Sequence, residues 1–194
     1  MPFPAPEVER EALHTRTVRV DAYARADGQW DLDAELIDFK HYDFPRRAGK
    51  NGVQRAGDPV HHLFLRITFD ESFTITAARA SYEAAPYEQQ CTGIAPAYDA
   101  LVGMNLLKGF RDTVKRRFAR SAGCTHMTEL SYVLPTAAIQ SLSGRRRQQQ
   151  ETGQDQRRPF QLGGCHALRM DGPVAKEFYP KWYVTPVAET QSDG

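Results

Sequence analysis

The chain has 194 residues, of which 41% are hydrophobic and 25% charged, and its formal net charge is +1. This size fits one domain with one main core, and the composition is that of an ordinary globular protein rather than a disordered one. A charge so close to zero argues against a broad surface for nucleic acid or membranes. We therefore expect a single domain over residues 1–194 that binds neither, with order over about 10–142 and 159–184.

The N-terminal segment and the cysteines bear on the compartment. MPFPAPEVEREALHTRT contains no apolar run long enough for a signal peptide, and no later segment approaches the roughly 20 apolar residues of a membrane span. Cys91, Cys124 and Cys165 form an odd set at wide spacing, which in a reducing compartment favours free thiols or metal ligands over disulfides. We therefore expect a cytoplasmic protein.

Strict alternation of apolar and polar residues predicts the first half of the fold. TRTVRVDAYAR (15–25) and WDLDAELIDF (30–39) flank the turn ADG, and HHLFLRITF and FTITAARASYE flank the turn DES. Such pairs are typical of half-buried β-hairpins. They predict one antiparallel sheet of about four strands built from two successive hairpins. The pattern leaves the pairing order between the hairpins open.

From Ala97 the period becomes that of a helix. Apolar side chains recur at every fourth position: Val102, Leu106, Phe110, Val114 and Phe118. This repeat predicts a long amphipathic helix packed on the sheet, in which close packing would justify Gly103 and Gly109. A further helix is predicted to start at GCTH (123–126), with a break near Pro135. The predicted fold class is α+β: an antiparallel sheet packed against a long helix and shorter C-terminal helices.

Residues 143–158, SGRRRQQQETGQDQRR, contain no apolar side chain. Such a segment buries too little surface to offset the entropy lost on ordering, so it predicts a mobile loop. Its arginines could contact phosphate, but no aromatic residue is interleaved for base stacking, and a solvated linker is the preferred interpretation. Residues 185–194, TPVAETQSDG, are predicted to form a tail.

Cys124 and His126 lie two positions apart at the predicted start of a helix. Backbone N–H groups at such a position favour a thiolate. Glu129 shares the helical face of His126 and could orient the imidazole or act as a carboxylate ligand. The alternative is structural, with Cys124 as a small buried side chain and Glu129 as a favourable acid in the first turn.

Further thiols and imidazoles extend the list of candidates. Cys91 follows the second predicted hairpin, at a junction of the kind that often carries function. His61 and His62 begin the third predicted strand and must face opposite sides, and the adjacent Cys165 and His166 likewise cannot both face one site. Zinc-finger spacing is absent, so distant segments would have to assemble any metal site. The candidate ligands for zinc or iron are Cys91, Cys124, His126 and His61.

No GxSxG, P-loop, GxGxxG or HExxH motif is present, which removes the better-marked hydrolase, nucleotide-binding and zincin classes. The residues that could supply acids, bases and an anion clamp are His126, Glu129, Cys124, Tyr98 and Arg169. We expect an enzyme for a small-molecule substrate, with a Cys/His site at the sheet–helix junction. The alternative is a metal or iron–sulfur carrier without its own catalysis, and a homodimer is left open.

Four segments, GIAPAYDALVGMNLLKGF, AGCTHMTEL, RPFQLGGCHALR and EFYPKWY, carry a family resemblance. Through them the chain resembles the bacterial domain-of-unknown-function family 2889, from about REALHTRTVRV to KWY. This resemblance implies membership and brings no activity with it.

A fainter resemblance is to the fold of the NifU-type iron–sulfur scaffolds. HHLFLRITFDESFTITAARASYE leads to Cys91, and Cys124 and His126 occupy the place of a later cysteine and histidine. Where those scaffolds have a cysteine and an aspartate, RAGDPVHH offers Asp58 or His61. A mixed set of Cys, His and carboxylate ligands suits zinc or iron better than an assembling cluster, which favours thiolates.

Overall fold

The computed structural model describes residues 4–46, 52–153, 157–159 and 161–186. The chain divides into two compact units, Met1–Ser143 and Gly144–Gly194, whereas the sequence predicts a single domain. We call them the first and second units and describe each by itself. No helix among the described residues combines the length and the apolar character that crossing a membrane requires.

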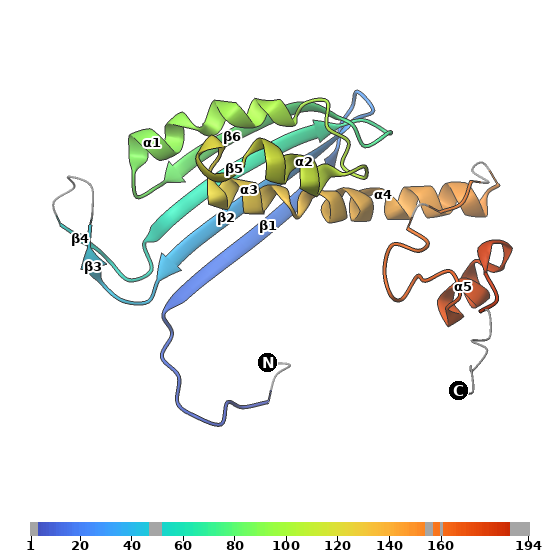
Figure 1. Cartoon of the computed structure of the whole chain (residues 1–194), viewed down its shortest axis with the longest axis horizontal. Helices are drawn as coiled ribbons and strands as arrows, with labels where there is room; N and C mark the ends of the chain where they lie inside the picture. The colour runs from blue at the N-terminus through green and yellow to red at the C-terminus, as the bar shows by residue number, and fades with distance from the viewer. Residues whose placement is uncertain (1–3, 47–51, 154–156, 160, 187–194) are drawn as a thin grey trace, which may run out of the picture. The chain divides into compact units, whose positions relative to one another are not determined.

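A four-stranded antiparallel sheet forms the framework of the first unit (Figure 1). Its strand order is β1-β2-β5-β6, so strands that follow one another in this order are hydrogen-bonded neighbours. A separate two-stranded sheet, β3 with β4, lies between β2 and β5 in the chain. The strands are β1 (His14–Ala24), β2 (Trp30–Lys40), β3 (Phe44–Pro45), β4 (Val53–Gln54), β5 (Pro59–Phe69) and β6 (Ile75–Ala84). This sheet and the helices confirm the α+β class.

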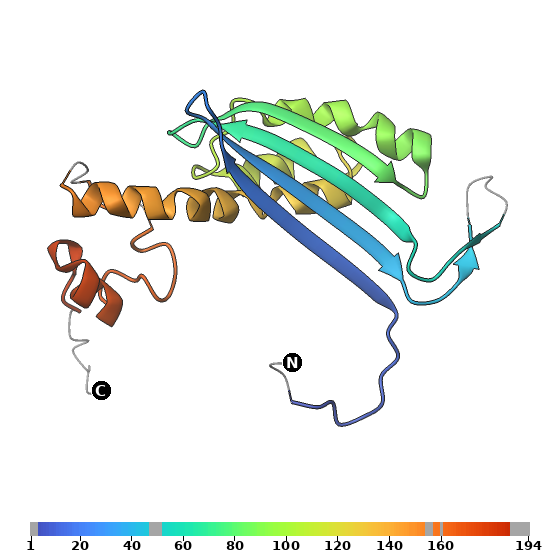
Figure 2. The ribbon, with the colours of Figure 1, turned by 180° about the vertical axis from the view of Figure 1, so that it is seen from behind.

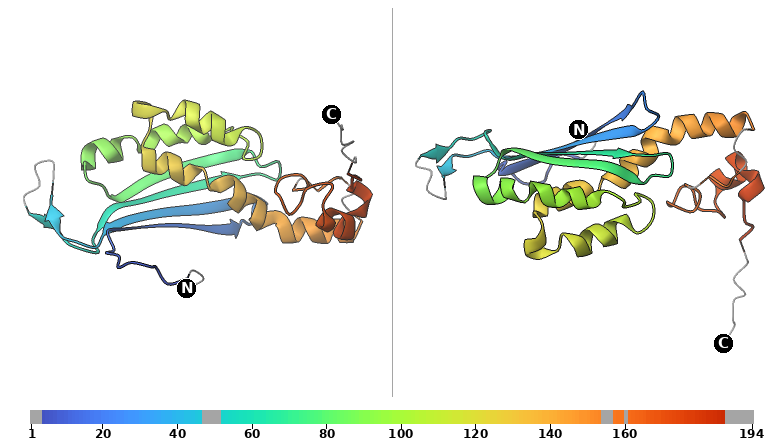
Figure 3. Two further views of the ribbon diagram at one scale, coloured as in Figure 1. Left: turned by 60° about the horizontal axis from the view of Figure 1, so that its bottom comes forward. Right: turned by 90° about the horizontal axis from the view of Figure 1, so that it is seen from above.

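Helices cover one face of this sheet. Seen from behind, the strands lie in front of α1, α2 and α3 (Figure 2), and an edge-on view places these helices on one side (Figure 3, right). The helices are α1 (Glu88–Gly93), η1 (Ala95–Leu101), α2 (Phe110–Arg117), η2 (Arg120–Ala122), α3 (Thr125–Ser131), α4 (Leu134–Glu151), α5 (Pro173–Phe178) and η3 (Pro180–Trp182), where η denotes a 3-10 helix.

The covered face holds the core. Alternate residues of β2 and β5 point into it, and cross-strand pairs such as Leu36 with Leu63 and Ala34 with Leu65 are almost fully buried. The alternation seen in the sequence therefore identifies the buried side correctly for β5, where Leu63, Leu65, Ile67 and Phe69 have no exposed surface. Removing such side chains from water is the main stabilising term for a unit of this kind.

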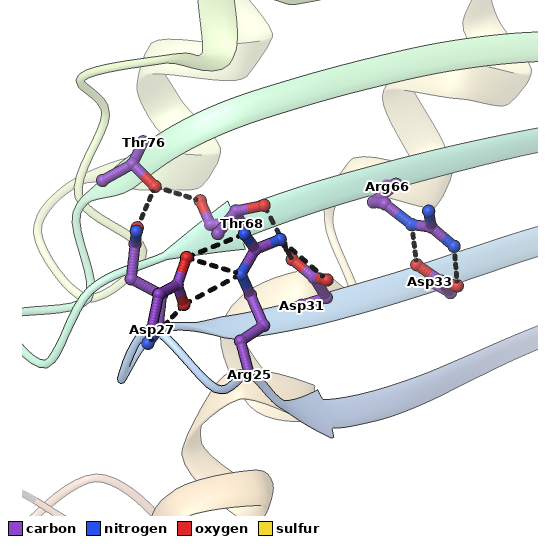
Figure 4. Close-up of polar contacts among 8 residues, drawn as sticks. Arg25, Asp27, Asp31, Asp33, Arg66, Thr68 and Thr76 are labelled. Atoms are coloured by element: carbon purple, nitrogen blue, oxygen red, sulfur yellow. Dashed lines mark hydrogen bonds and ion pairs between the residues drawn. The ribbon is translucent and has the colours of Figure 1, made fainter.

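The opposite face of the sheet is polar. Arg66 pairs with Asp33 across β5 and β2, and Arg25 pairs with both Asp27 and Asp31 (Figure 4). These side chains are substantially exposed, apart from Asp31 and Asp33, and ion pairs exposed to water add little to stability. This face therefore presents charged side chains to water, so it is stable without a layer of helices over it.

The prediction of a long amphipathic helix from Ala97 is wrong. Gly103 and Gly109 adopt positive φ angles of 86° and 62°, in the left-handed region that interrupts a right-handed helix. The intervening backbone pairs with the sheet instead: Gly103 N–H donates to Ile75 O at 2.8 Å, and Ile75 N–H donates to Met104 O at 2.9 Å. The glycines therefore serve a loop that docks on the start of β6, between η1 and α2.

The mobile loop predicted from residue 143 is also corrected, because α4 continues to Glu151. Leu134, Ala138 and Leu142 are buried and anchor the start of this helix. Arginine, glutamine and glutamate have high helix propensity, so the polar stretch extends a helix that is already nucleated. Residues 154–156 of the predicted loop and 187–194 of the predicted tail lie outside the described residues.

Candidate metal centre

The centre of the site is Asp38, a carboxylate on the buried face of β2. It continues the alternation of Trp30, Leu32, Ala34 and Leu36, and it is only 3% exposed. A buried carboxylate is costly unless charged or hydrogen-bonding partners surround it. The neighbouring strands and α3 supply them.

Arg16 is the main partner. It lies opposite Asp38 on β1 and donates two hydrogen bonds, Nε to Oδ1 at 2.7 Å and Nη2 to Oδ2 at 2.8 Å. Its Nη1 also pairs with Glu129 on α3. Burial raises the pKa of Asp38, but the Arg16 hydrogen bonds and charge outweigh burial and hold that pKa below its ordinary value. Asp38 therefore remains an anion at neutral pH.

Two imidazoles meet the same carboxylate oxygen. His61 is the cross-strand partner of Asp38 on β5, and its Nδ1 lies 3.3 Å from Asp38 Oδ2. His126 comes from α3, and its Nε2 lies 3.5 Å from the same oxygen. The two rings stack, with centroids 3.8 Å apart and planes inclined by 30°. Burial, followed by the nearby His126, lowers the pKa of His61 to about 4, so this ring is neutral at neutral pH.

Asp38, His61 and His126 together have the composition and spacing of a metal site. One ligand atom from each lies within 4.8 Å of the others. Ligands about 2.05 Å from a tetrahedral zinc ion are about 3.4 Å from one another, close to the 3.3 and 3.5 Å separations between the imidazole nitrogens and Asp38 Oδ2. Two imidazoles and a carboxylate suit zinc or iron(II). The donor set therefore fits the metals expected from the sequence.

Cys124 lies beside this group, as the residue immediately before α3. Burial raises the pKa of its thiol, but the His126 side chain, the Met127 N–H and the Tyr82 hydroxyl lower it, and the result is a pKa of about 7. The Tyr82 hydroxyl is itself buried and has no partner of good hydrogen-bond geometry among the described residues, so its contact with the thiol is a close approach rather than a formed bond.

Tyr98 fixes the position of Cys124. Its ring is fully buried, and its hydroxyl donates to Cys124 O and accepts from Cys124 N–H, each at 2.9 Å. Thr128 Oγ1 lies at the same distance and can donate the third bond. The hydroxyl is thus fully used in holding the start of α3.

Comparison with known families decides the membership of the chain. The model of a family described as "Protein of unknown function (DUF2889)" matches residues 14–140. This chain belongs to that family. No curated protein and no solved structure matches, so the resemblance to NifU-type scaffolds gains no support. The DUF2889 match runs from the start of β1 into α4, and it therefore contains every residue of the candidate metal centre.

The structure brings some of the candidate residues together and separates others. His61 and His126 share Asp38, and Glu129 joins them through Arg16. Cys91 lies on α1, and among the described residues it is not part of the compact ligand group. Two further candidates stand apart: Cys124 is adjacent to the group without belonging to it, and Arg169 lies in the second unit, paired with Asp171 at 3.4 Å.

Asp38 and Arg16 were missed by the sequence analysis. A signal for Asp38 was present, because it occupies the apolar side of the alternation in WDLDAELID. An acid at such a position is rarely buried without a partner. Arg16 likewise falls on the side of Val18 and Val20 in the DUF2889 region, but no sequence pattern indicates that it meets Asp38.

Proposed function

We propose that this protein is an enzyme that acts on a small molecule with the help of a divalent metal ion, zinc or iron(II), held by Asp38, His61 and His126. The observation that supports the proposal most is that three ligand atoms from β2, β5 and α3 lie within 4.8 Å of one another. Burying such ionisable groups costs free energy because they lose contact with water. Clusters of this kind concentrate at functional sites.

Three protein ligands suit catalysis better than structural support. Structural zinc sites are usually closed by four protein ligands, whereas catalytic sites keep a position for water or substrate. The side chains of His61 and His126 are 18% and 24% exposed, which leaves access from their side. When bound there, a metal ion would polarise a substrate oxygen or lower the pKa of a water molecule.

The neighbouring charges support the ligands. Arg16 fixes the orientation of the Asp38 carboxylate, as partners in the outer shell of metal sites commonly do. Its positive charge is offset by Glu129, so the pair of acids with one arginine keeps a net negative charge for a cation. The carrier alternative has less support, because the compact ligand group among the described residues contains no thiolate and iron–sulfur clusters are held mainly by thiolates.

Metal titration of the purified chain tests the proposal. Calorimetry with Zn²⁺, and visible absorption with Co²⁺ as a spectroscopic substitute, should each give one site per chain. His61→Ala and His126→Ala should each weaken binding by about 100-fold or more, since even outer-shell changes cost about 10–100-fold. Cys124→Ala should bind normally under the enzyme proposal, whereas its loss of metal would favour the carrier.

His62→Ala is the matched control. His62 is adjacent to His61 but faces the other side of the sheet, where Nε2 lies 2.7 Å from Glu35. This variant should bind metal like the unaltered protein. Equal losses in the His61 and His62 variants, or no loss in either, would contradict the proposed ligand set.

A further inference from the structure

A cavity of about 750 Å³ is lined in part by residues that neighbour two members of the candidate metal centre in the sequence. Its lining includes Lys40, two residues beyond Asp38 on β2, and Val60, which directly precedes His61 on β5. Its size is within the range of about 300–1,000 Å³ that is usual for small-molecule sites. Every lining residue belongs to the first unit, so the cavity is a property of that unit alone.

Irregularities in the sheet accompany this cavity. Between β2 and β5 the register shifts beyond the Asp38–His61 pair, which leaves Val60 as an extra residue. Between β5 and β6 it shifts again next to His62, which leaves Glu83 as an extra residue. β-Bulges bend strands and are common beside active sites. Both extra residues line the cavity.

Four aromatic residues contribute to the lining. Tyr42 and Phe44 come from the segment around β3, and Tyr82 and Tyr87 come from the end of β6 and the residue before α1. Rings supplied by two segments of the chain favour a flat apolar ligand, because stacked or tilted aromatic pairs contribute beyond the area they bury.

Lys40 supplies the charge. Its Nζ donates to Tyr42 Oη at 2.9 Å and lies 4.6 Å from the ring centroid of Phe44. Both partners are neutral, and among the described residues no ion pair of Lys40 is found. By contrast, Glu83 in the same lining is engaged by His62 at 3.1 Å. Lys40 is therefore a cation of the lining without an ion pair among the described residues; the lining also contains Arg46 and the acids Asp58 and Glu88.

We propose that this cavity binds a small aromatic carboxylic acid, with the carboxylate on Lys40 and the ring between the aromatic side chains. This inference rests on the proposed function, because it makes the cavity the substrate site of the same metal centre. Lys40 and Asp38 share a side of β2, and two residues of strand span roughly 7 Å. A single ring with one further substituent has about that length, so the substituent opposite the carboxylate would lie on the side of the cavity where Lys40 and Val60 adjoin Asp38 and His61 in the sequence.

Titration of the full chain with simple probe acids tests this assignment. Calorimetry is run with benzoate, cyclohexanecarboxylate, benzylamine and inorganic phosphate, once with Zn²⁺ and once with EDTA. Benzoate should bind, cyclohexanecarboxylate should bind several-fold more weakly because it lacks the aromatic ring, and benzylamine should not bind. Phosphate or benzylamine binding as tightly as benzoate would overturn the assigned class.

Variants locate the binding in the cavity. Lys40→Gln should weaken benzoate binding roughly tenfold or more, as expected for the loss of a charged hydrogen bond, and Lys40→Arg should restore most of it. Lys108→Gln removes an exposed lysine outside the lining and should have no effect. Unchanged affinity in Lys40→Gln would overturn the proposal.

The two proposals fail in different ways. Benzoate binding that persists in EDTA, from a chain that gives no Co²⁺ spectrum, would support the cavity and reject the metal. Tight Co²⁺ binding without benzoate binding would reject the cavity and leave the metal centre. If both hold, benzoate should change the visible absorption of the Co²⁺-loaded chain.

Discussion

The imidazole rings of His61 on β5 and His126 on α3 stack at 3.8 Å, and both direct a nitrogen at one oxygen of Asp38. Two protonated rings at this distance would repel each other, and the low pKa of His61 reflects that repulsion together with burial. The arrangement is thus suited to neutral imidazoles, which is the protonation state that metal ligands require. Four sets of measurements test this arrangement and the fold around it.

Asp38→Asn should destabilise the chain by about 2–4 kcal/mol, because it leaves Arg16 beside an uncharged amide in a mostly buried setting. Arg16 is one-third exposed, which keeps the expected loss below that of a fully buried pair. Asp33→Asn is the matched change on the open face, where the partner Arg66 is 61% exposed, and it should cost at most about 1 kcal/mol. Urea unfolding measures both, and equal small losses would contradict the structure.

The metal-free chain should lose stability as the pH falls from about 6.5 to about 4. The pKa of His61 is about 4 in the folded state, against about 6.5 when unfolded. In this window the unfolded chain binds more protons, so folding is favoured less as acid is added, by up to about 3 kcal/mol in total. The groups that face His61 are Asp38, His126 and Arg16.

Urea unfolding at several pH values, with chelator present, checks the effect. His61→Gln should flatten the curve between pH 6.5 and 4. The lowered pKa of Asp38 acts in the same direction but at lower pH, since its stabilising effect is lost only below the unfolded value of about 3.9. If His61→Gln keeps the full dependence of stability on pH, another group is responsible for that dependence.

Tyr98→Phe and Tyr82→Phe should differ sharply in their effect on stability, although both remove one buried phenolic hydroxyl. The Tyr98 hydroxyl satisfies the backbone of Cys124, so its removal should cost about 1–3 kcal/mol. The Tyr82 hydroxyl has no well-formed bond among the described residues, and its removal should change stability by less than about 0.5 kcal/mol or increase it. Thermal unfolding and amide exchange at Cys124 provide the comparison, and a larger loss from Tyr82→Phe would refute it.

Gly103→Ala and Gly144→Ala should change the free energy of unfolding in opposite directions. Gly103 has a φ of 86°, so alanine should cost about 1 kcal/mol or more from backbone strain alone, since no atom crowds the added carbon. Gly144 lies inside α4 with open space around it, and alanine there should stabilise by about 0.5–1 kcal/mol. Stabilisation by Gly103→Ala would instead support the continuous helix expected from the sequence.

The sheet could be predicted from the sequence because alternation is a local property. Each strand displays its own buried side: the alternation in HHLFLRITF puts Leu63 and Ile67 on one face, and both are fully buried. The prediction of a helix over 97–118 is wrong for a related reason. Its repeat of every fourth residue includes Val102, which is 48% exposed, because the apolar residues before and after Gly109 serve different elements.

The site was only partly predictable. His61 and His126 were both candidates, yet their meeting depends on how α3 crosses β5, which is a tertiary relationship without a local signature. Asp38 could have been recognised as an acid on an apolar stripe. Cys91 was expected to share the site because of its place in the chain, and the structure instead groups the imidazoles with a carboxylate.

The polar side of the sheet has a practical consequence. Its charged pairs, such as Arg66 with Asp33, are on the side without helices, separated from the imidazoles by the thickness of the backbone layer. A fluorophore or an immobilisation linker attached at Tyr23, opposite Asp31, or at Arg79, opposite Arg66, would therefore lie away from the candidate ligands. Attachment that does not use thiol chemistry is required, because Cys91, Cys124 and Cys165 are free thiols. Such attachment makes single-molecule or surface-based readouts of ligand binding feasible with the ring pair left intact.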